Sequence, residues 1–235
     1  MPGDAPTWAA VILAGGRGSR LGGADKAALR LGGVPLVDRL LSALADAAAV
    51  VVVGDHPPTS AAALVRVSVV RENPPFGGPV AATAAGLDEL SRLEESARVP
   101  GHPDAVALLA VDMPHAAAAL PLLLDAWPSS AEAGQEADGV IAVDGAGRRQ
   151  SLLALYRTDR LREAVAGIVR ERGGVEGSSM RLLLAGLDLR EVPVPDLAAA
   201  DVDTPEDAAR LGIELRKAAD AAGRGEAGHE EGTPR

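Results

Sequence analysis

The chain contains no cysteine, and this absence removes three kinds of chemistry at once. Without thiols there can be no disulfide bond, no zinc site with cysteine ligands and no thiol nucleophile. Aromatic residues make up only 2% of the sequence, so a hydrophobic core must be built from Leu, Val, Ile and Ala. A chain without cysteine is compatible with the cytoplasm, and a cytoplasmic location is what we expect.

Positive charge and long apolar runs are also scarce. The formal net charge is −10, whereas proteins that wrap nucleic acid normally carry a basic surface, so DNA and RNA are not expected partners. The apolar run at residues 9–14 is too short for a signal peptide, and no run is long enough to span a bilayer. An acidic enzyme can still bind an anionic substrate where its cations are concentrated locally.

Hydrophobic residues make up 47% of the 235 residues, which is enough for a globular core. Short apolar runs alternate with segments that have leucines at helical spacing. This alternation predicts a three-layer, Rossmann-like α/β fold, with a mostly parallel, twisted sheet and helices on both faces. Strands are expected at residues 8–13, 50–53, 67–70, 105–111, 140–143, 152–156 and 189–194, and helices at 35–47, 79–90, 120–127, 159–170, 178–185 and 205–219. Flexible segments are expected at 94–104 and 129–137, and a disordered tail at 221–235.

The first expected strand ends at Leu13 and runs into a segment with five glycines, LAGGRGSRLGGADK, which closes at Lys26. Glycines let backbone N–H groups approach phosphates, and Arg17, Arg20 and Lys26 add positive charge. The spacing fits neither the Rossmann fingerprint nor the Walker A loop, because Leu21 stands at the third glycine position and Asp25 precedes the lysine. A glycine-rich surface turn or a nucleotide loop of another kind remains.

Carboxylates occur at two other informative places. Asp112 follows the strand expected at residues 105–111, where a carboxylate near a phosphate loop suits Mg²⁺, although an aspartate that caps a helix is the simpler alternative. In DVDTPED, which begins at residue 201, Thr204 and Asp207 have a sufficient role at a helix start. Asp201 and Asp203 do not, and either could supply a second metal ligand.

The glycine-rich segment resembles the signature of the molybdenum cofactor guanylyltransferase family, with Leu21 in place of the usual Met. The resemblance implies a fold of the nucleotide-diphospho-sugar transferase type in a single domain at residues 1–220. The nucleotide-binding half would span about residues 8–115 and the acceptor-binding half about residues 116–220. The motif residues that carry the resemblance are Leu13, Ala14, Gly15, Gly16, Arg20, Gly22, Gly23, Asp25 and Lys26.

The resemblance also implies roles for individual residues. Arg20, Lys26 and Asp112 would be catalytic, with Mg²⁺ held by Asp112. Asp203, where the family has Asn, is our own candidate for a second metal ligand. Arg148, Arg149 and Gln150 are expected to contact the anionic pterin acceptor, with a solvated turn as the alternative. The expected nucleotide-binding residues are Leu13, Ala14, Gly15, Gly16, Arg17, Gly18, Lys26, Glu72, Gly78 and Pro79.

The implied reaction is transfer of GMP from GTP to molybdopterin, by a monomer or weak oligomer. The motif Asp201-x-Asp203-Thr-Pro-Glu instead resembles the sister cytidylyl- and adenylyltransferases, whereas Leu13-Ala-Gly-Gly16 favours the guanylyltransferases. A sugar-1-phosphate nucleotidyltransferase is disfavoured by Asp25-Lys26, since those enzymes usually have Pro-Lys. A non-catalytic nucleotide or pterin carrier would have no reason to combine Asp112 with Lys26.

Overall fold

A computed structural model describes residues 6–15, 26, 29–55, 59, 67–99, 101–128 and 137–214. The expected tail at 221–235 and most of the loop expected at 129–137 lie outside these residues. One seven-stranded sheet takes strands from both predicted halves of the chain. All its neighbouring strands are parallel except β8, which runs antiparallel to β6 and β7, so the mostly parallel sheet is confirmed. The strand order is β5 (Val67–Val70), β4 (Val50–Val53), β1 (Trp8–Leu13), β6 (Ala105–Ala110), β8 (Arg149–Arg157), β7 (Gly139–Val143) and β9 (Leu189–Pro193).

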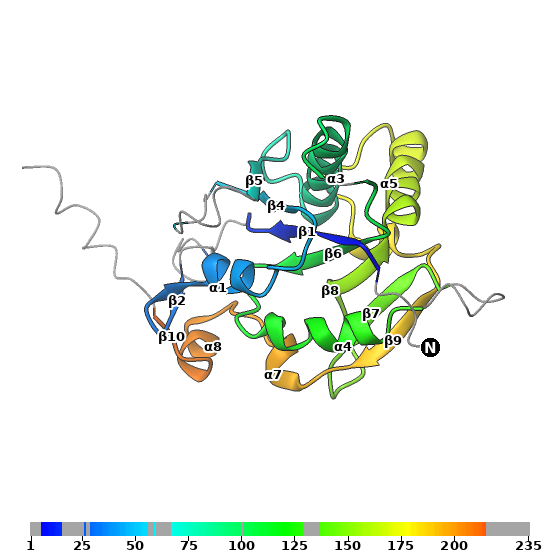
Figure 1. The fold of residues 1–235 in the computed structure, drawn as a ribbon. Helices are drawn as coiled ribbons and strands as arrows, with labels where there is room; N and C mark the ends of the chain where they lie inside the picture. The colour runs from blue at the N-terminus through cyan, green and yellow to red at the C-terminus, as the bar shows by residue number, and fades with distance from the viewer. Residues whose placement is uncertain are drawn as a thin grey trace, which may run out of the picture.

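Helices cover both faces of this sheet, which gives the three expected layers (Figure 1). Residues of β1 alternate between two cores: Ala10 and Ile12 pack into one, and Ala9 and Val11 pack into the other. Burial on both faces explains why β1, β4 and β6 are continuous apolar runs rather than alternating ones. No helix within the described ranges is long and apolar enough to cross a membrane. One face carries α3 (Pro79–Glu95), α5 (Thr158–Arg172) and α6 (Met180–Leu183), and the other carries α1 (Leu36–Ser42), η3 (Ala116–Ala118), α4 (Leu120–Asp125) and α7 (Asp196–Ala199).

A second, three-stranded sheet corrects the predicted last helix. Helix α8 (Pro205–Arg210) begins with the expected capping box, but Gly212 then takes a φ of +69°, a left-handed conformation that favours glycine. The chain continues as β10 (Ile213–Glu214), so the helix expected at 205–219 is wrong at residues 212–214, and residues 215–219 lie outside the described part of the chain. β10 pairs with β2 (Arg30–Leu31), which pairs with β3 (Val34–Pro35).

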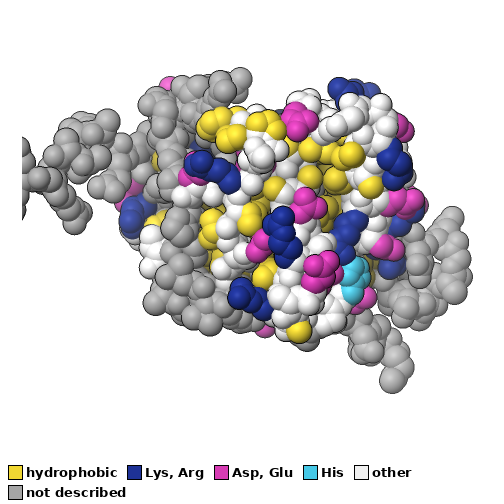
Figure 2. Space-filling view, turned by 90° about the horizontal axis from the view of Figure 1, so that it is seen from above, with side chains coloured by type: hydrophobic (Ala, Val, Ile, Leu, Met, Phe, Trp, Pro, Cys, Tyr) yellow, Lys and Arg dark blue, Asp and Glu magenta, His cyan; other side chains and the backbone are white. Residues whose placement is uncertain are grey.

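The segment expected to be flexible at residues 94–104 begins inside α3. Glu94 accepts a hydrogen bond of 2.9 Å from Arg162 of α5, and its other carboxylate oxygen lies 2.9 Å from Nδ1 of His102. Burial disfavours the charge of Glu94, but these two partners outweigh it and hold the pKa of Glu94 below its ordinary value. Figure 2 views the molecule from the side of α3 and α5, and acidic, basic and hydrophobic side chains are interspersed on this surface. The prediction of flexibility is therefore wrong at Glu94, which ties α3 to α5.

Close packing of α3 on β1 yields a stability prediction. A Cβ at Gly86 would overlap the side chain of Val11, so Gly86→Ala is expected to lower the free energy of unfolding by about 1–3 kcal/mol. Gly167→Ala in α5 is the matched control, because its Cβ would meet no atom closer than 3.8 Å. It should raise stability by up to about 1 kcal/mol, as helix propensity predicts. Urea unfolding of the two variants checks this; equal stabilities would contradict the packing.

Candidate active site

A pocket of about 350 Å³ opens beside the carboxyl ends of β1 and β6. Ligands of open α/β sheets bind at this edge, so the pocket lies where the sequence predicted a site. Its wall combines backbone near the glycine-rich segment, a loop that precedes α3, and charged side chains. The lining residues are Leu13, Gly15, Lys26, Glu72, Phe76, Gly78, Pro79, Ala82, Ala110, Val111, Asp112 and Leu152.

The start of the glycine-rich segment is fixed by its neighbouring strands. The backbone N–H of Ala14 donates to the carbonyl of Val53 at 2.8 Å, and that of Val111 donates to the carbonyl of Leu13 at 3.1 Å. A Cβ added to Gly15 would lie 3.8 Å from the carboxylate of Glu72, so backbone and carboxylate are neighbours here. Leu13 and Gly15, both predicted to bind the nucleotide, line the pocket. The predicted residues Gly16, Arg17, Gly18 and Arg20 lie outside the described part of the chain.

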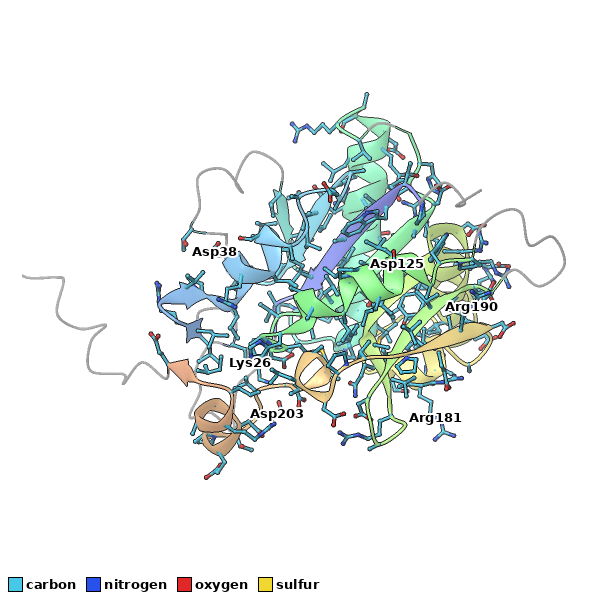
Figure 3. All side chains as sticks on the ribbon, turned by 60° about the horizontal axis from the view of Figure 1, so that its bottom comes forward. Lys26, Asp38, Asp125, Arg181, Arg190 and Asp203 are labelled. Carbon is cyan, nitrogen blue, oxygen red and sulfur yellow. The ribbon has the colours of Figure 1, made fainter. Side chains whose placement is uncertain are left out.

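Lys26 joins two aspartates that are distant in sequence. Its Nζ donates to Oδ2 of Asp112 at 2.8 Å and to Oδ1 of Asp203 at 2.5 Å, and the Lys26 side chain is only 17% exposed. Figure 3 shows Lys26 and Asp203 next to each other, with Asp125 well apart. The backbone N–H of Val202 donates to the carbonyl of Asp112 at 2.9 Å, which holds the two aspartate segments together. The structure thus assembles the three predicted residues.

The carboxylates of Asp112 and Asp203 stabilise the positive charge of Lys26. Burial alone would lower the pKa of Lys26, but Asp112 and then Asp203 raise it above its ordinary value, so the ammonium stays protonated. Burial raises the pKa of Asp201, and the neighbouring charges of Asp203 and Asp112 raise it further. The described residues contain no group of three or more His, Asp or Glu side chains arranged to hold a metal. Two carboxylates that already converge on one cation nevertheless fit Mg²⁺, which commonly takes one or two carboxylates together with substrate phosphates.

The loop before α3 supplies another part of the pocket wall. Glu72 is 8% exposed, and its Oε1 accepts the backbone N–H of Phe76 at 3.1 Å. Gly78 has a φ of +94° and precedes the first turn of α3, which Pro79 opens. All three predicted residues of this loop line the pocket. Phe76, which sequence reasoning did not select, lines it as well; an aromatic residue in a chain with a single Phe was the available signal.

The predicted acceptor residues lie at the same edge of the sheet but do not line this pocket. Arg149 and Gln150 belong to β8, which begins three residues before the expected strand start. Asp144 accepts hydrogen bonds from Nε of Arg148 at 2.8 Å and from Nε2 of Gln150 at 3.1 Å, and Arg149 pairs with Glu191 at 2.7 Å. Arg149 and Gln150 pair with β7 and so lie in a strand rather than in the turn expected as the alternative, although the Arg149 side chain is exposed, as that alternative expected.

Solved structures of similar fold come from several enzymes. Molybdopterin-guanine dinucleotide biosynthesis protein A from Archaeoglobus fulgidus superposes with a TM-score of 0.56 at 19% identity and covers 87% of this chain and 96% of its own. A 2-C-methyl-D-erythritol 4-phosphate cytidylyltransferase from Thermus thermophilus gives a TM-score of 0.51 at 22% identity, over 86% and 96% of the two chains. These likenesses establish the fold.

Sequence comparison establishes the family. A molybdenum cofactor guanylyltransferase from Mesorhizobium japonicum is 31% identical over 205 residues, which cover 80% of this chain and 91% of the relative. One from Cupriavidus metallidurans is 40% identical over 80 residues, so the match spans only 39% of that relative and 34% of this chain. Residues 10–188 match the MobA-like NTP transferase domain. The chain therefore belongs to the family of MobA-like NTP transferase domains.

Proposed function

We propose that the protein is a Mg²⁺-dependent nucleotidyltransferase that transfers GMP from GTP to the phosphate of molybdenum-molybdopterin and releases pyrophosphate. The observation that carries this proposal is the Lys26 ammonium between Asp112 and Asp203, in the wall of a pocket at the carboxyl edge of the sheet. A phosphate-neutralising cation beside two carboxylates is what phosphoryl-type transfer requires. The name of the Mesorhizobium relative supports the base and the acceptor.

The chemistry needs no activated protein nucleophile. An oxygen of the acceptor phosphate attacks the α-phosphorus of GTP, the bond from that phosphorus to the oxygen bridging to the β-phosphorus breaks, and pyrophosphate leaves. The attacking oxygen is already anionic, which agrees with a chain that has no cysteine. Lys26 would neutralise the negative charge that develops on the phosphates, and backbone from Gly15 onward would approach them closely.

The metal fits the two carboxylates that now face Lys26. Asp112 and Asp203 would hold Mg²⁺, and bound Mg²⁺ supplies charge neutralisation for the phosphates. Lys26 would donate to a phosphate oxygen of the nucleotide in place of one of its present carboxylate partners, and its charge would stay satisfied. Arg148 and Arg149, which lie at the same sheet edge, are proposed to receive the anionic acceptor by exchanging their present carboxylate partners for its phosphate.

The Glu72 carboxylate is expected to bind guanine in preference to cytosine. Its buried carboxylate lies in the pocket wall next to Gly15. Guanine presents two adjacent N–H donors on its pairing edge, which match the two acceptor oxygens of a carboxylate. Cytosine presents one donor beside an acceptor nitrogen, and that nitrogen would repel the carboxylate. The same buried group therefore favours one base and disfavours the other.

Calorimetric titration with GTP and with CTP, each with Mg²⁺, tests the base assignment. We expect GTP to bind at least about tenfold more tightly than CTP, because a buried acceptor left unpaired costs about 1–3 kcal/mol. Glu72→Gln, which retains shape but exchanges one acceptor for a donor, should narrow this preference. A preference for CTP would make the protein a cytidylyltransferase, and the Asp201-x-Asp203 motif would then have been the better guide.

A further inference from the structure

We infer that Phe76 is the stacking platform for the nucleotide base, so that its ring covers the face of the guanine while Glu72 binds the edge. This inference rests on the proposed function, since it concerns the base of the nucleotide that the pocket would hold. Phe76 is the only phenylalanine in the chain, and it lines the pocket with 57% of its surface exposed. A large exposed aromatic side chain in a pocket wall offers a flat face to a ligand.

The backbone of Phe76 is held in a conformation that bulky residues rarely adopt. Its φ is +65°, in the left-handed region, where a non-glycine residue is uncommon and carries a conformational cost. Such a cost persists only where the surroundings determine the conformation. Phe76 donates its N–H to the buried carboxylate of Glu72 at 3.1 Å, so one contact ties together the two residues proposed to receive the base.

The residue that follows Phe76 is fixed as well. The carbonyl of Gly77 accepts the N–H of Gly177 at 2.8 Å, which joins the loop to the segment before α6. A Cβ at Gly77 would lie 2.8 Å from Cβ of Ala81 in α3, so the backbone packs directly on the helix. The ring of Phe76 is therefore presented on a backbone anchored by α3 and by the α5–α6 connection. A rigid platform loses little conformational freedom when a ligand binds.

Position and chemistry together select a nucleobase as the occupant of this face. Leu13 and Gly15, at the start of the glycine-rich segment, lie in the same pocket as Phe76, and Lys26 and Asp112 line it as well. If the phosphates of a nucleotide contact Lys26, its base would occupy the part of the pocket that is lined by Phe76 and Glu72. Stacking on an aromatic ring contributes to binding for any base, so Phe76 supplies affinity and Glu72 supplies the choice of base.

The test compares two substitutions with opposite effects on the ring. Asn tolerates the left-handed backbone, so Phe76→Asn removes the aromatic face without new strain, whereas Phe76→Tyr retains it. Calorimetry with GTP and Mg²⁺ should show binding about 5- to 150-fold weaker for Phe76→Asn and within about twofold of the original for Phe76→Tyr. Inorganic tripolyphosphate with Mg²⁺, which has no base, should bind all three proteins equally. Val169→Ala, an exposed apolar truncation on α5, is the control and should change neither affinity.

The outcomes separate this inference from the proposed function. If the unmodified protein binds GTP and Phe76→Asn binds it equally well, the stacking platform is refuted while the proposed function stands. If Phe76→Asn weakens GTP and tripolyphosphate to the same extent, Phe76 shapes the loop rather than contacting the base, and the inference is again refuted. If the unmodified protein binds tripolyphosphate but gains no affinity from the base, the nucleotide assignment itself fails.

Discussion

Asp112→Asn is expected to lower kcat/KM for guanylyl transfer by about 10³-fold or more, since a bound metal contributes several kcal/mol of charge stabilisation. The substitution removes one of the two carboxylates that face Lys26 and that would hold Mg²⁺. The fold should survive, because the Asp112 side chain is partly exposed and the backbone carbonyl of Asp112 still accepts the N–H of Val202. Pyrophosphate release measured over a range of Mg²⁺ concentrations checks the loss.

Asp125→Asn provides the matched control for that experiment. Asp125 is an exposed aspartate at the end of α4 and lies apart from Lys26 and Asp203 (Figure 3). The Asp125→Asn variant should retain the original rate of guanylyl transfer and its original dependence on Mg²⁺ concentration. The account would be contradicted if Asp112→Asn remained folded and kept more than about a tenth of the original kcat/KM, which is a loss of less than 1.4 kcal/mol.

Lys26→Met is expected to lower kcat by about 10²- to 10³-fold, the cost of removing one charge-stabilising donor. The same substitution should increase the affinity of the protein for a divalent cation. Without the ammonium, Asp112 and Asp203 lose the cation that donates to both of them, so a divalent cation should bind the nucleotide-free protein more tightly. Mn²⁺ binding followed by electron paramagnetic resonance measures this directly, without any turnover.

The control for Lys26→Met is Arg92→Met, which removes a 70% exposed cation from α3. It should leave both turnover and Mn²⁺ binding unchanged. A Lys26→Met protein that folds and keeps full turnover would exclude Lys26 from the reaction. Unchanged Mn²⁺ affinity would show that the ammonium does not compete with the metal for the two aspartates.

Most of the central sheet could be predicted because its strands are buried on both faces. The apolar runs of β1, β4 and β6 have the length of buried strands and are short for helices, so they indicate strands. The small sheet of β2, β3 and β10 was missed because two-residue strands carry no periodicity. Its pairing of Ile213 with Leu31 joins residues that lie far apart in the sequence, and local sequence contains no signal for such a contact.

The site was predictable where a motif ends a strand. Asp112 follows the end of β6 closely, Lys26 closes the glycine-rich segment that follows β1, and both line the pocket. Phe76 was missed because its place in the pocket wall goes with a left-handed backbone and a hydrogen bond to Glu72, neither of which is visible in the sequence. The pairing of Arg149 with Glu191 of β9 was missed because it depends on which strands flank β7.

The most direct test of the central claim is product analysis with all substrates present. Purified protein would be incubated with Mg²⁺, GTP and molybdenum-molybdopterin, and both pyrophosphate and the modified pterin would be quantified. We expect one pyrophosphate to be released for each guanine dinucleotide formed, with no release when the acceptor is omitted and little product when CTP replaces GTP. A protein that binds GTP and the pterin but joins neither, or that forms a dinucleotide only from CTP, would contradict the central claim.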